Sequence, residues 1–318
     1  MPLVIFSALL HAYVGWRIVP ALALPWSAAF AVLLLASALL MPFGLWARRI
    51  RTQPLSDRLA WAGLLFMGLF SSLFVLTVLR DLLLLAAAAV VWVRPASFSL
   101  DAFAALSAAA VPLLGIALTV LGLVNARRTA AVVTVDVPIA DLPAALHGFT
   151  IAQISDLHVG PTIKRGYLER VVGAVNRIGA DMIAVTGDLV DGSVLQLGAH
   201  VAPLARLESR HGTFFVTGNH EYYSGASAWI VELRRLGLIV LLNEHVVLRH
   251  DAASLVVAGV TDYGAHHYGA DQRSDPAAAL AGAPVAAPVR LLLAPQPRSA
   301  MAAADVGFDL QLSGHPHG

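Results

Sequence analysis

The stretch Ile183-Ala184-Val185-Thr186-Gly187-Asp188-Leu189-Val190-Asp191 decides the fold of the C-terminal half of this chain. Its apolar, β-branched start reads as a short strand, and a Gly-Asp pair follows directly. The glycine lets the chain turn sharply and leaves room beside the carboxylate. Ligands in α/β folds collect outside the carboxyl ends of strands. We therefore predict that Asp188 and Asp191 lie at such a sheet edge.

Three further apolar segments run into polar residues in the same way. Residues 151–155 precede Asp156-Leu157-His158, residues 214–217 precede Gly218-Asn219-His220-Glu221, and residues 310–313 precede Gly314-His315-Pro316-His317. Each motif alone is more often a turn or a solvated loop. Four of them, each directly after a strand, predict a single rim that gathers aspartate, histidine and asparagine side chains.

The gathered side chains are suited to binding metal ions. In Asp156-x-His158 a carboxylate and an imidazole can turn toward one ion, and a carboxylate can also bridge two ions. Oxygen and nitrogen ligands without sulfur suit Mn²⁺, Fe or Zn²⁺ better than Ca²⁺. The absence of Cys excludes thiolate sites and thiol nucleophiles. Neither a Gly-x-Ser-x-Gly elbow nor a P-loop is present. The sequence therefore predicts a metal-dependent hydrolase.

Short β-rich segments alternate with amphipathic ones from residue 131 onward. The predicted strands are 132–137, 150–154, 182–185, 213–216, 255–260, 290–293 and 309–312. The predicted helices are 165–178, 201–207, 226–236 and 297–304. This order predicts an α/β fold whose strands lead into loops at one edge.

The four motifs together resemble those of the calcineurin-like metallophosphoesterases, over about residues 148–318. The apolar N-terminus is similar to that of membrane-bound bacterial members. The resemblance implies a four-layer αββα sandwich with two divalent metal ions, which activate water and clamp the phosphoryl group. It implies that Asp156, His158 and His317 hold the first metal, that Asp188 bridges both, and that Asn219 and His315 bind the second. It also implies that His220 is the general acid and that Asp191 assists catalysis by contacting the site residues without itself binding a metal.

The sequence departs from the family pattern at Pro295, where we expect a histidine ligand to the second metal. Proline has no side-chain atom that can bind a metal. Loss of a residue that only supports a ligand lowers metal affinity roughly 10- to 100-fold, so we expect loss of the ligand itself to cost at least as much. His266 and His267 could stand in, although paired loop histidines are usually solvated. Pro316 also restricts the backbone between the last two histidines.

Two readings of the function follow from these departures. The first is a phosphoesterase that hydrolyses a phosphomonoester, phosphodiester or pyrophosphate bond at the membrane surface. The second is a degenerate, catalytically impaired member that binds one metal or a phosphorylated ligand as a membrane scaffold or regulator. The chain ends at Gly318, one residue beyond a predicted ligand, so we expect the phosphoesterase domain, 129–318, to be truncated at its C-terminus.

Residues 1–128 are predicted to form an all-α transmembrane domain. The whole chain is 58% hydrophobic and 13% charged, against about a quarter charged in typical globular domains. Apolar runs occur at 3–15, 28–45, 59–79 and 103–124. Most of them have about the length of roughly 20 residues that a helix needs to cross a bilayer, so we predict four spans. A signal peptide is the alternative for the first run, but no basic segment precedes it. The run at 82–93 is too short to cross alone, so Arg80 and Asp81 are expected at the membrane interface.

The arginines indicate the orientation of the spans. Basic residues cluster in the loop after the second span, at Arg48, Arg49, Arg51 and Arg58, and after the fourth span, at Arg127 and Arg128. Cytoplasmic loops are enriched in such residues. We therefore predict a multi-pass protein of the bacterial inner membrane type with a cytoplasmic catalytic domain. Its expected partners are the lipid bilayer and a phosphorylated small-molecule or lipid-linked substrate. A net charge of only +1 argues against nucleic acid.

Overall fold

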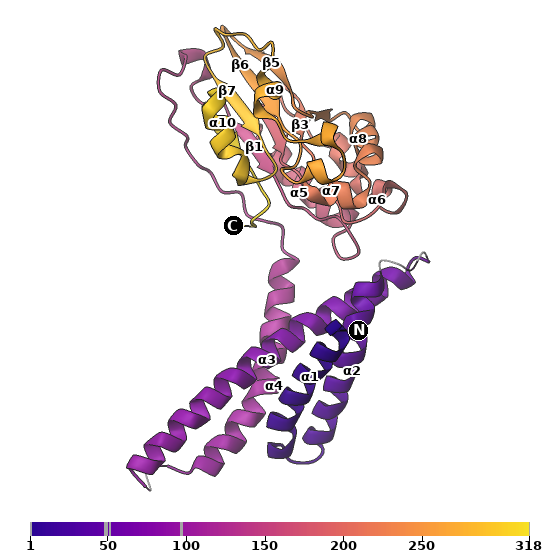
Figure 1. Ribbon diagram of the computed structural model, residues 1–318, viewed down its shortest axis with the longest axis vertical. Coiled ribbons are helices and arrows are strands. Elements are labelled where there is room, and N and C mark those ends of the chain that lie inside the picture. Colours follow the sequence, from indigo (N-terminus) through magenta and orange to yellow (C-terminus); the bar gives the residue numbers. More distant parts are fainter. Residues whose placement is uncertain (1, 48–49, 51, 96–97, 318) are drawn as a thin grey trace. The chain divides into compact units, whose positions relative to one another are not determined.

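The computed structural model describes residues 2–47, 50, 52–95 and 98–317 (Figure 1). Arg48, Arg49, Arg51 and Gly318 lie outside the described residues. The chain divides into two compact units, Met1–Arg128 and Thr129–Gly318.

The first unit is built from helices whose outward faces are apolar. They are α1 (Pro2–Ile18), a 3₁₀ turn at Val19–Ala21, α2 (Trp26–Trp46), α3 (Leu55–Val93) and α4 (Leu100–Ala126). Side chains such as Val14, Phe30, Leu73 and Val111 pack between the helices. Many others, including Leu9 and Val32, stay exposed. In the part of the chain that the structure describes, four helices are long and apolar enough to cross a membrane.

Helix α3 is longer than the predicted span of 59–79. It continues without a break through Arg80 and Asp81 to Val93, so residues 82–93 are an extension of the same helix. At about 1.5 Å per residue, a helix of 39 residues is about 58 Å long, almost twice the bilayer core of about 30 Å. The extension needs no hydrogen-bond partner of its own, because a continuous helix satisfies its backbone internally.

Arg80 and Asp81 are held by the neighbouring helices. Arg80 is 5% exposed, and its guanidinium donates to Oγ of Ser107 at 3.1 Å and to a carbonyl of α4. The Asp81 carboxylate accepts hydrogen bonds from Arg17 at 2.8 Å and from the hydroxyl of Tyr13 at 2.7 Å. These contacts fix α3 against both α1 and α4.

The second unit contains two four-stranded sheets. The first sheet is parallel, in the order β1 (Ile151–Ile154), β2 (Met182–Val185), β3 (Thr213–Phe215) and β4 (Ile239–Val240). The second has the order β5 (Glu244–His250), β6 (Ala253–Gly259), β7 (Arg290–Leu293) and β8 (Leu310–Leu312). Its β5–β6 pair is antiparallel and its other pairs are parallel. Parallel neighbours bring their carboxyl ends to the same edge, which is what gathers the motifs.

The alternation of side chains along the strands creates the layers. Met182 and Ala184 of β2 point into the core between the two sheets, whereas Ile183 and Val185 point into the core beneath the outer helices. Helices α5 (Arg165–Asn176), α6 (Val194–Val201) and α8 (Ala226–Arg235) cover the first sheet. Helices α9 (Pro276–Leu280) and α10 (Ala300–Val306) cover the second. The predicted four-layer αββα sandwich is therefore confirmed.

Some element predictions were wrong. Residues 132–137 form no strand: they are extended without a sheet partner, and Val133 is 81% exposed. Strand β5 was not predicted. The predicted helix at 201–207 is the end of α6 followed by a 3₁₀ helix at Ala202–Arg206. Further 3₁₀ helices among the described residues are Ala144–Leu146, Ala265–His267, Ala270–Gln272 and Pro297–Ser299.

Candidate metal centre

The predicted site residues meet at the carboxyl ends of four strands. Asp156 and His158 follow β1, and Asp188 and Asp191 follow β2. Asn219 and His220 open the short helix α7 (Asn219–Ser224) directly after β3, and His315 and His317 follow β8. The second sheet therefore contributes two histidines to a rim that the first sheet supplies with its carboxylates.

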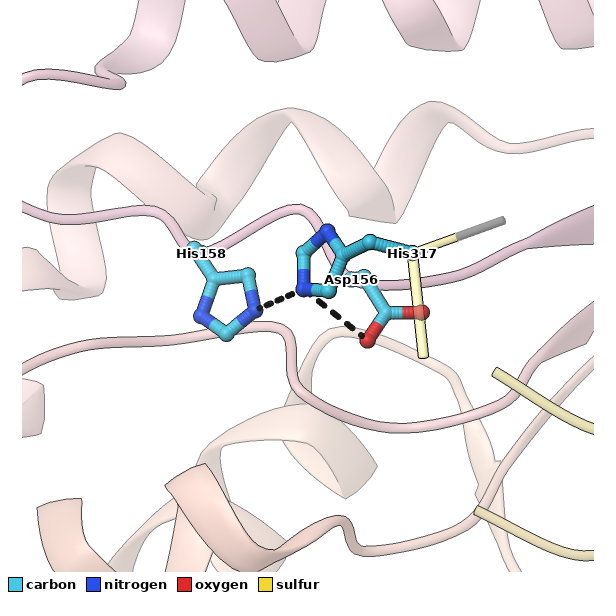
Figure 2. Close-up of side chains that lie close together, drawn as sticks. All are labelled: Asp156, His158 and His317. Carbon is cyan, nitrogen blue, oxygen red and sulfur yellow. Dashed lines mark hydrogen bonds and ion pairs between the residues drawn. The ribbon is translucent and has the colours of Figure 1, made fainter. Parts of the chain in front are cut away.

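Asp156, His158 and His317 form one group of closely spaced ligand atoms. Their ligand atoms all lie within 4.8 Å of one another. Figure 2 shows the two imidazoles facing each other, with Nε2 to Nε2 at 3.2 Å, and Nε2 of His317 is 3.6 Å from Oδ1 of Asp156. Two nitrogens bound tetrahedrally at about 2.0–2.1 Å from one ion lie about 3.3 Å apart. The donor set and its spacing thus fit a divalent ion.

A second group forms around Asp188, which is 4% exposed. Nδ1 of His315 lies 3.3 Å from Oδ2 of Asp188, as expected of two ligands to the second metal. Ligand atoms of His158, Asp188 and His220 also lie within 4.8 Å of one another. Asp188 therefore lies within reach of imidazoles from both sides, which suits the bridging role that the family resemblance implies.

The backbone at the site is held in a conformation that most residues avoid. Five predicted ligands have positive φ, namely Asp156 (55°), His158 (47°), Asp188 (51°), His315 (78°) and His317 (56°). Such strained non-glycine residues persist where the surrounding structure dictates them, and they cluster at functional sites. Glycines make room for the ligands: a Cβ on Gly218 would lie 2.3 Å from Oδ1 of Asp188, and one on Gly314 would lie 2.4 Å from Oδ2 of Asp156.

Asp191 supports two imidazoles at once. Its Oδ1 lies 3.3 Å from Nδ1 of His158 and 2.5 Å from Nδ1 of His220. The hydrogen bond to Asp191 raises the pKa of His158, although burial acts against it. Burial alone would raise the pKa of Asp191, but its bonds to the two histidines hold that pKa below its usual value. Because Nδ1 of His158 faces Asp191, its Nε2 is left for a metal ion, an arrangement common in metalloproteins.

Glu221 is a structural part of the site that the sequence analysis did not assign. It is fully buried and accepts hydrogen bonds from the backbone N–H groups of Asp188, Leu189, Val190 and Gly218. Burial and the charge of Asp188 raise the pKa of Glu221 to about 8, against the opposing effect of these donors. Glu221 thus fixes the loop that presents Asp188. Its place within Gly218-Asn219-His220-Glu221 was the one available signal.

The ends of β6 and β7 add a second unpredicted contact. Asp262 is 1% exposed and accepts a hydrogen bond at 2.7 Å from the amide of Gln296. Burial raises the pKa of Asp262.

Pro295 is buried beside Gly187, on the side of the site where the missing histidine was expected. His266 and His267 lie on an exposed 3₁₀ turn.

An αββα sandwich with carboxylate and imidazole ligands at its strand ends defines a metal-dependent phosphoesterase domain, here attached to membrane-type helices. The chain belongs to the calcineurin-like phosphoesterase family, whose sequence profile matches residues 149–318, more than half of the chain.

Relatives include membrane proteins. The chain is 40% identical over 211 residues to a "Transmembrane protein with metallophosphoesterase domain" of Bos taurus and 36% identical to its namesake in Danio rerio, in each case over 63% of this chain and 47% of the relative. It is 36% identical over 168 residues to an uncharacterized metallophosphoesterase of Helicobacter pylori, over 52% of this chain and 44% of the relative. The chain thus spans about half the length of the curated relatives it matches.

Proposed function

We propose that this protein is a membrane-bound hydrolase that cleaves a phosphomonoester, phosphodiester or pyrophosphate bond. One observation carries the proposal: ligand atoms of Asp156, His158 and His317 converge within 4.8 Å at the strand ends, beside the buried Asp188. Bound divalent ions, of which Mn²⁺, Fe and Zn²⁺ suit these ligands best, would supply a water nucleophile and neutralise phosphoryl charge.

The proposed acid is His220. Asp191 accepts a hydrogen bond from Nδ1 of this ring at 2.5 Å, which orients the imidazole and leaves Nε2 to pass a proton to the leaving oxygen. His220→Ala should therefore lower kcat by about 10²- to 10⁴-fold with metal content unchanged. Loss of a metal ion in this variant would instead assign His220 as a ligand, since its ring also lies within reach of Asp188.

A cavity of about 710 Å³ beside the metal centre supports an amphipathic, lipid-linked substrate. Asp156, His158 and His317 line its polar side, and apolar side chains including Leu157, Ile163 and Tyr167 line the remainder. A phosphate bound at the ligands could therefore carry an apolar group into this cavity. Longer acyl chains on a phosphodiester substrate should then lower KM, and Ile163→Asp should remove that preference.

We also propose a multi-pass topology of the bacterial inner membrane type, with the catalytic domain in the cytoplasm. The four membrane-type helices support four crossings. With four crossings, Arg58, Arg127 and Arg128 would lie on the same side of the membrane as the domain, and basic residues are enriched in cytoplasmic loops.

The alternative function is that of an impaired member acting as a membrane scaffold or regulator. It is favoured by Pro295, which offers no ligand on the side of the second metal. Full-length protein should be assayed with Mn²⁺ on a chromogenic phosphodiester, beside Asp188→Asn and Pro295→His. Activity that Asp188→Asn abolishes supports the hydrolase. A large gain in Pro295→His shows an enzyme impaired at one ligand. Equal rates in all three proteins would refute hydrolysis at this site.

A further inference from the structure

A second group of metal-ligating side chains lies at the opposite end of the first sheet. Asp181 directly precedes β2, His211 lies two residues before β3, and His250 is the last residue of β5. Asp181 and His211 lie at the amino ends of two parallel strands, and His250 lies at the carboxyl end of the antiparallel strand β5, whereas the metal centre described above lies at the carboxyl ends of the parallel strands. The group is therefore separate from the phosphoesterase site, and no role has been assigned to it.

We propose that Asp181, His211 and His250 bind one transition-metal ion such as Zn²⁺, Ni²⁺ or Cu²⁺. Nε2 of His211 lies 3.0 Å from Nδ1 of His250, and the same Nδ1 lies 3.8 Å from Oδ1 of Asp181. Two imidazoles and a carboxylate without sulfur are ligands that these ions accept. His250 is 8% exposed, and Asp181 and His211 are partly exposed.

Two of the three distances between ligand atoms are similar to those of the metal centre at the other end of the sandwich. There, the two imidazole nitrogens of His158 and His317 are 3.2 Å apart and the Asp156 carboxylate is 3.6 Å from one of them. The corresponding distances in the second group are 3.0 Å and 3.8 Å. The third distance differs: the ligand atoms of Asp156, His158 and His317 all lie within 4.8 Å of one another, whereas Oδ1 of Asp181 lies further than that from Nε2 of His211. Binding of one ion by all three therefore requires the Asp181 carboxylate to rotate toward His211.

Neighbouring contacts hold the three ligands in place. The backbone N–H of His211 donates to the carbonyl of Asp181 at 2.8 Å. The backbone N–H of Thr150 donates to Oδ2 of Asp181 at 2.8 Å, which leaves Oδ1 facing His250. The ring of Phe149 stacks on His211 and meets His250 edge to face. Each ligand thus has a support of its own, as metal sites require.

The nearby charges permit a cation. Nη1 of Arg210 lies 3.5 Å from Nε2 of His250, but this guanidinium is paired with Asp251 at 2.6 Å. A guanidinium can only donate, so Nε2 of His250 accepts the hydrogen bond from Arg210 and Nδ1–H of His250 donates to Nε2 of His211. Binding of an ion at Nδ1 requires the other tautomer, with the proton on Nε2, where Oδ2 of Asp251 lies 3.8 Å away. Because Asp251 compensates the charge of Arg210, the negative charge of Asp181 remains available to a cation.

An ion at this position would link the two sheets. Asp181 and His211 flank strands of the first sheet, and His250 ends a strand of the second. Metal binding to the folded state alone stabilises it. We therefore expect Zn²⁺ to raise the melting temperature of the phosphoesterase unit even when its catalytic ligands are removed.

The test uses full-length protein, purified in detergent without a polyhistidine tag, in which Asp156→Asn, Asp188→Asn and His317→Ala disable the catalytic centre. Elemental analysis after dialysis against Zn²⁺ should find one ion per chain, and Zn²⁺ should raise Tm. Adding His211→Gln should abolish both effects, because glutamine can still hydrogen-bond to His250 but is a poor ligand. His266→Gln, on an exposed turn, should change neither.

Copper spectroscopy decides the case if His211→Gln lowers stability by itself. Cu²⁺ bound to the background protein should show coupling to two imidazole nitrogens in its electron paramagnetic resonance spectrum. Absence of a retained ion in the background protein, or equal retention after His211→Gln, would overturn the proposal and leave the His211–His250 contact as a simple hydrogen bond.

Discussion

At the scale of single residues, Asp191 should couple the protonation of His158 to metal binding. It raises the pKa of His158, so in the metal-free protein a proton stays on this ligand until the pH exceeds a value above the usual 6.5. Metal ions compete with that proton. Affinity for Mn²⁺ should therefore rise with pH through the raised pKa, and Asp191→Asn should move this midpoint to lower pH.

Calorimetric titration with Mn²⁺ over a pH series measures that midpoint. Above it, Asp191→Asn should still bind about 10- to 100-fold more weakly, because the imidazole loses the group that orients it. Asp305→Asn, on the exposed face of α10, is the matched control. An unchanged midpoint in Asp191→Asn would contradict the role assigned to this carboxylate.

Glu221 should contribute to stability through the loop that it holds. Replacing it with glutamine puts an amide N–H₂ group where backbone N–H groups now find an acceptor, and buried unsatisfied donors cost about 1–3 kcal/mol. Thermal unfolding should show Glu221→Gln melting several degrees lower, while Glu208→Gln, which is exposed, should melt like the parent. Equal melting of both variants would mean that the loop does not depend on Glu221.

The residues that the sequence identified are those whose chemistry is local. Asp156, Asp188 and His317 follow apolar strands directly, so their placement depends on the strand before them. Glu221 and the Asp262–Gln296 pair gain their roles from contacts between distant segments, which no spacing in the sequence encodes. The positive φ of five ligands is equally a product of the assembled site.

Strands covered on both faces were predictable at the scale of elements, because burial forces a continuous apolar run such as β2. Residues 132–137 also have β-branched character but lack a neighbouring strand, and β propensity largely reflects packing against neighbours. Strand β5 was missed because Glu244, Arg249 and two histidines interrupt its pattern. Helix α3 is longer than its predicted span because Arg80 and Asp81 interrupt the apolar run without ending the helix.

That charged pair should determine how α1 packs. Asp81→Asn would leave Arg17 and Arg80 without their shared anion. Breaking a buried pair costs about 3–5 kcal/mol, and a smaller loss is expected here because the Asp81 side chain is 24% exposed. The helical unit in detergent should therefore unfold at lower temperature, and the double variant Arg17→Gln/Asp81→Asn should lose less than the two single changes combined. Asp101→Asn, at the exposed start of α4, is the control.

At the scale of the whole molecule, the proposed topology assigns each connection to one side of the membrane. Four crossings put the loop between α2 and α3 on the same side as the phosphoesterase unit, and the loop between α1 and α2 on the other. The chain has no Cys, so single introduced cysteines report their surroundings without background. Three exposed positions suit this test. Leu24 lies in the loop between α1 and α2, Thr52 in the loop between α2 and α3, and Ala252 in the phosphoesterase unit.

In intact bacterial cells, a membrane-impermeant maleimide should label Leu24→Cys and should not label Thr52→Cys or Ala252→Cys until the cells are lysed. The physical reason is the preference for arginine on the cytoplasmic side. The loops on the opposite side contain no comparable cluster of basic residues. Labelling of Ala252→Cys in intact cells would place the phosphoesterase unit outside. Opposite results for Thr52→Cys and Ala252→Cys would mean an odd number of crossings between them, and α3 with its 39 residues would be the helix to re-examine.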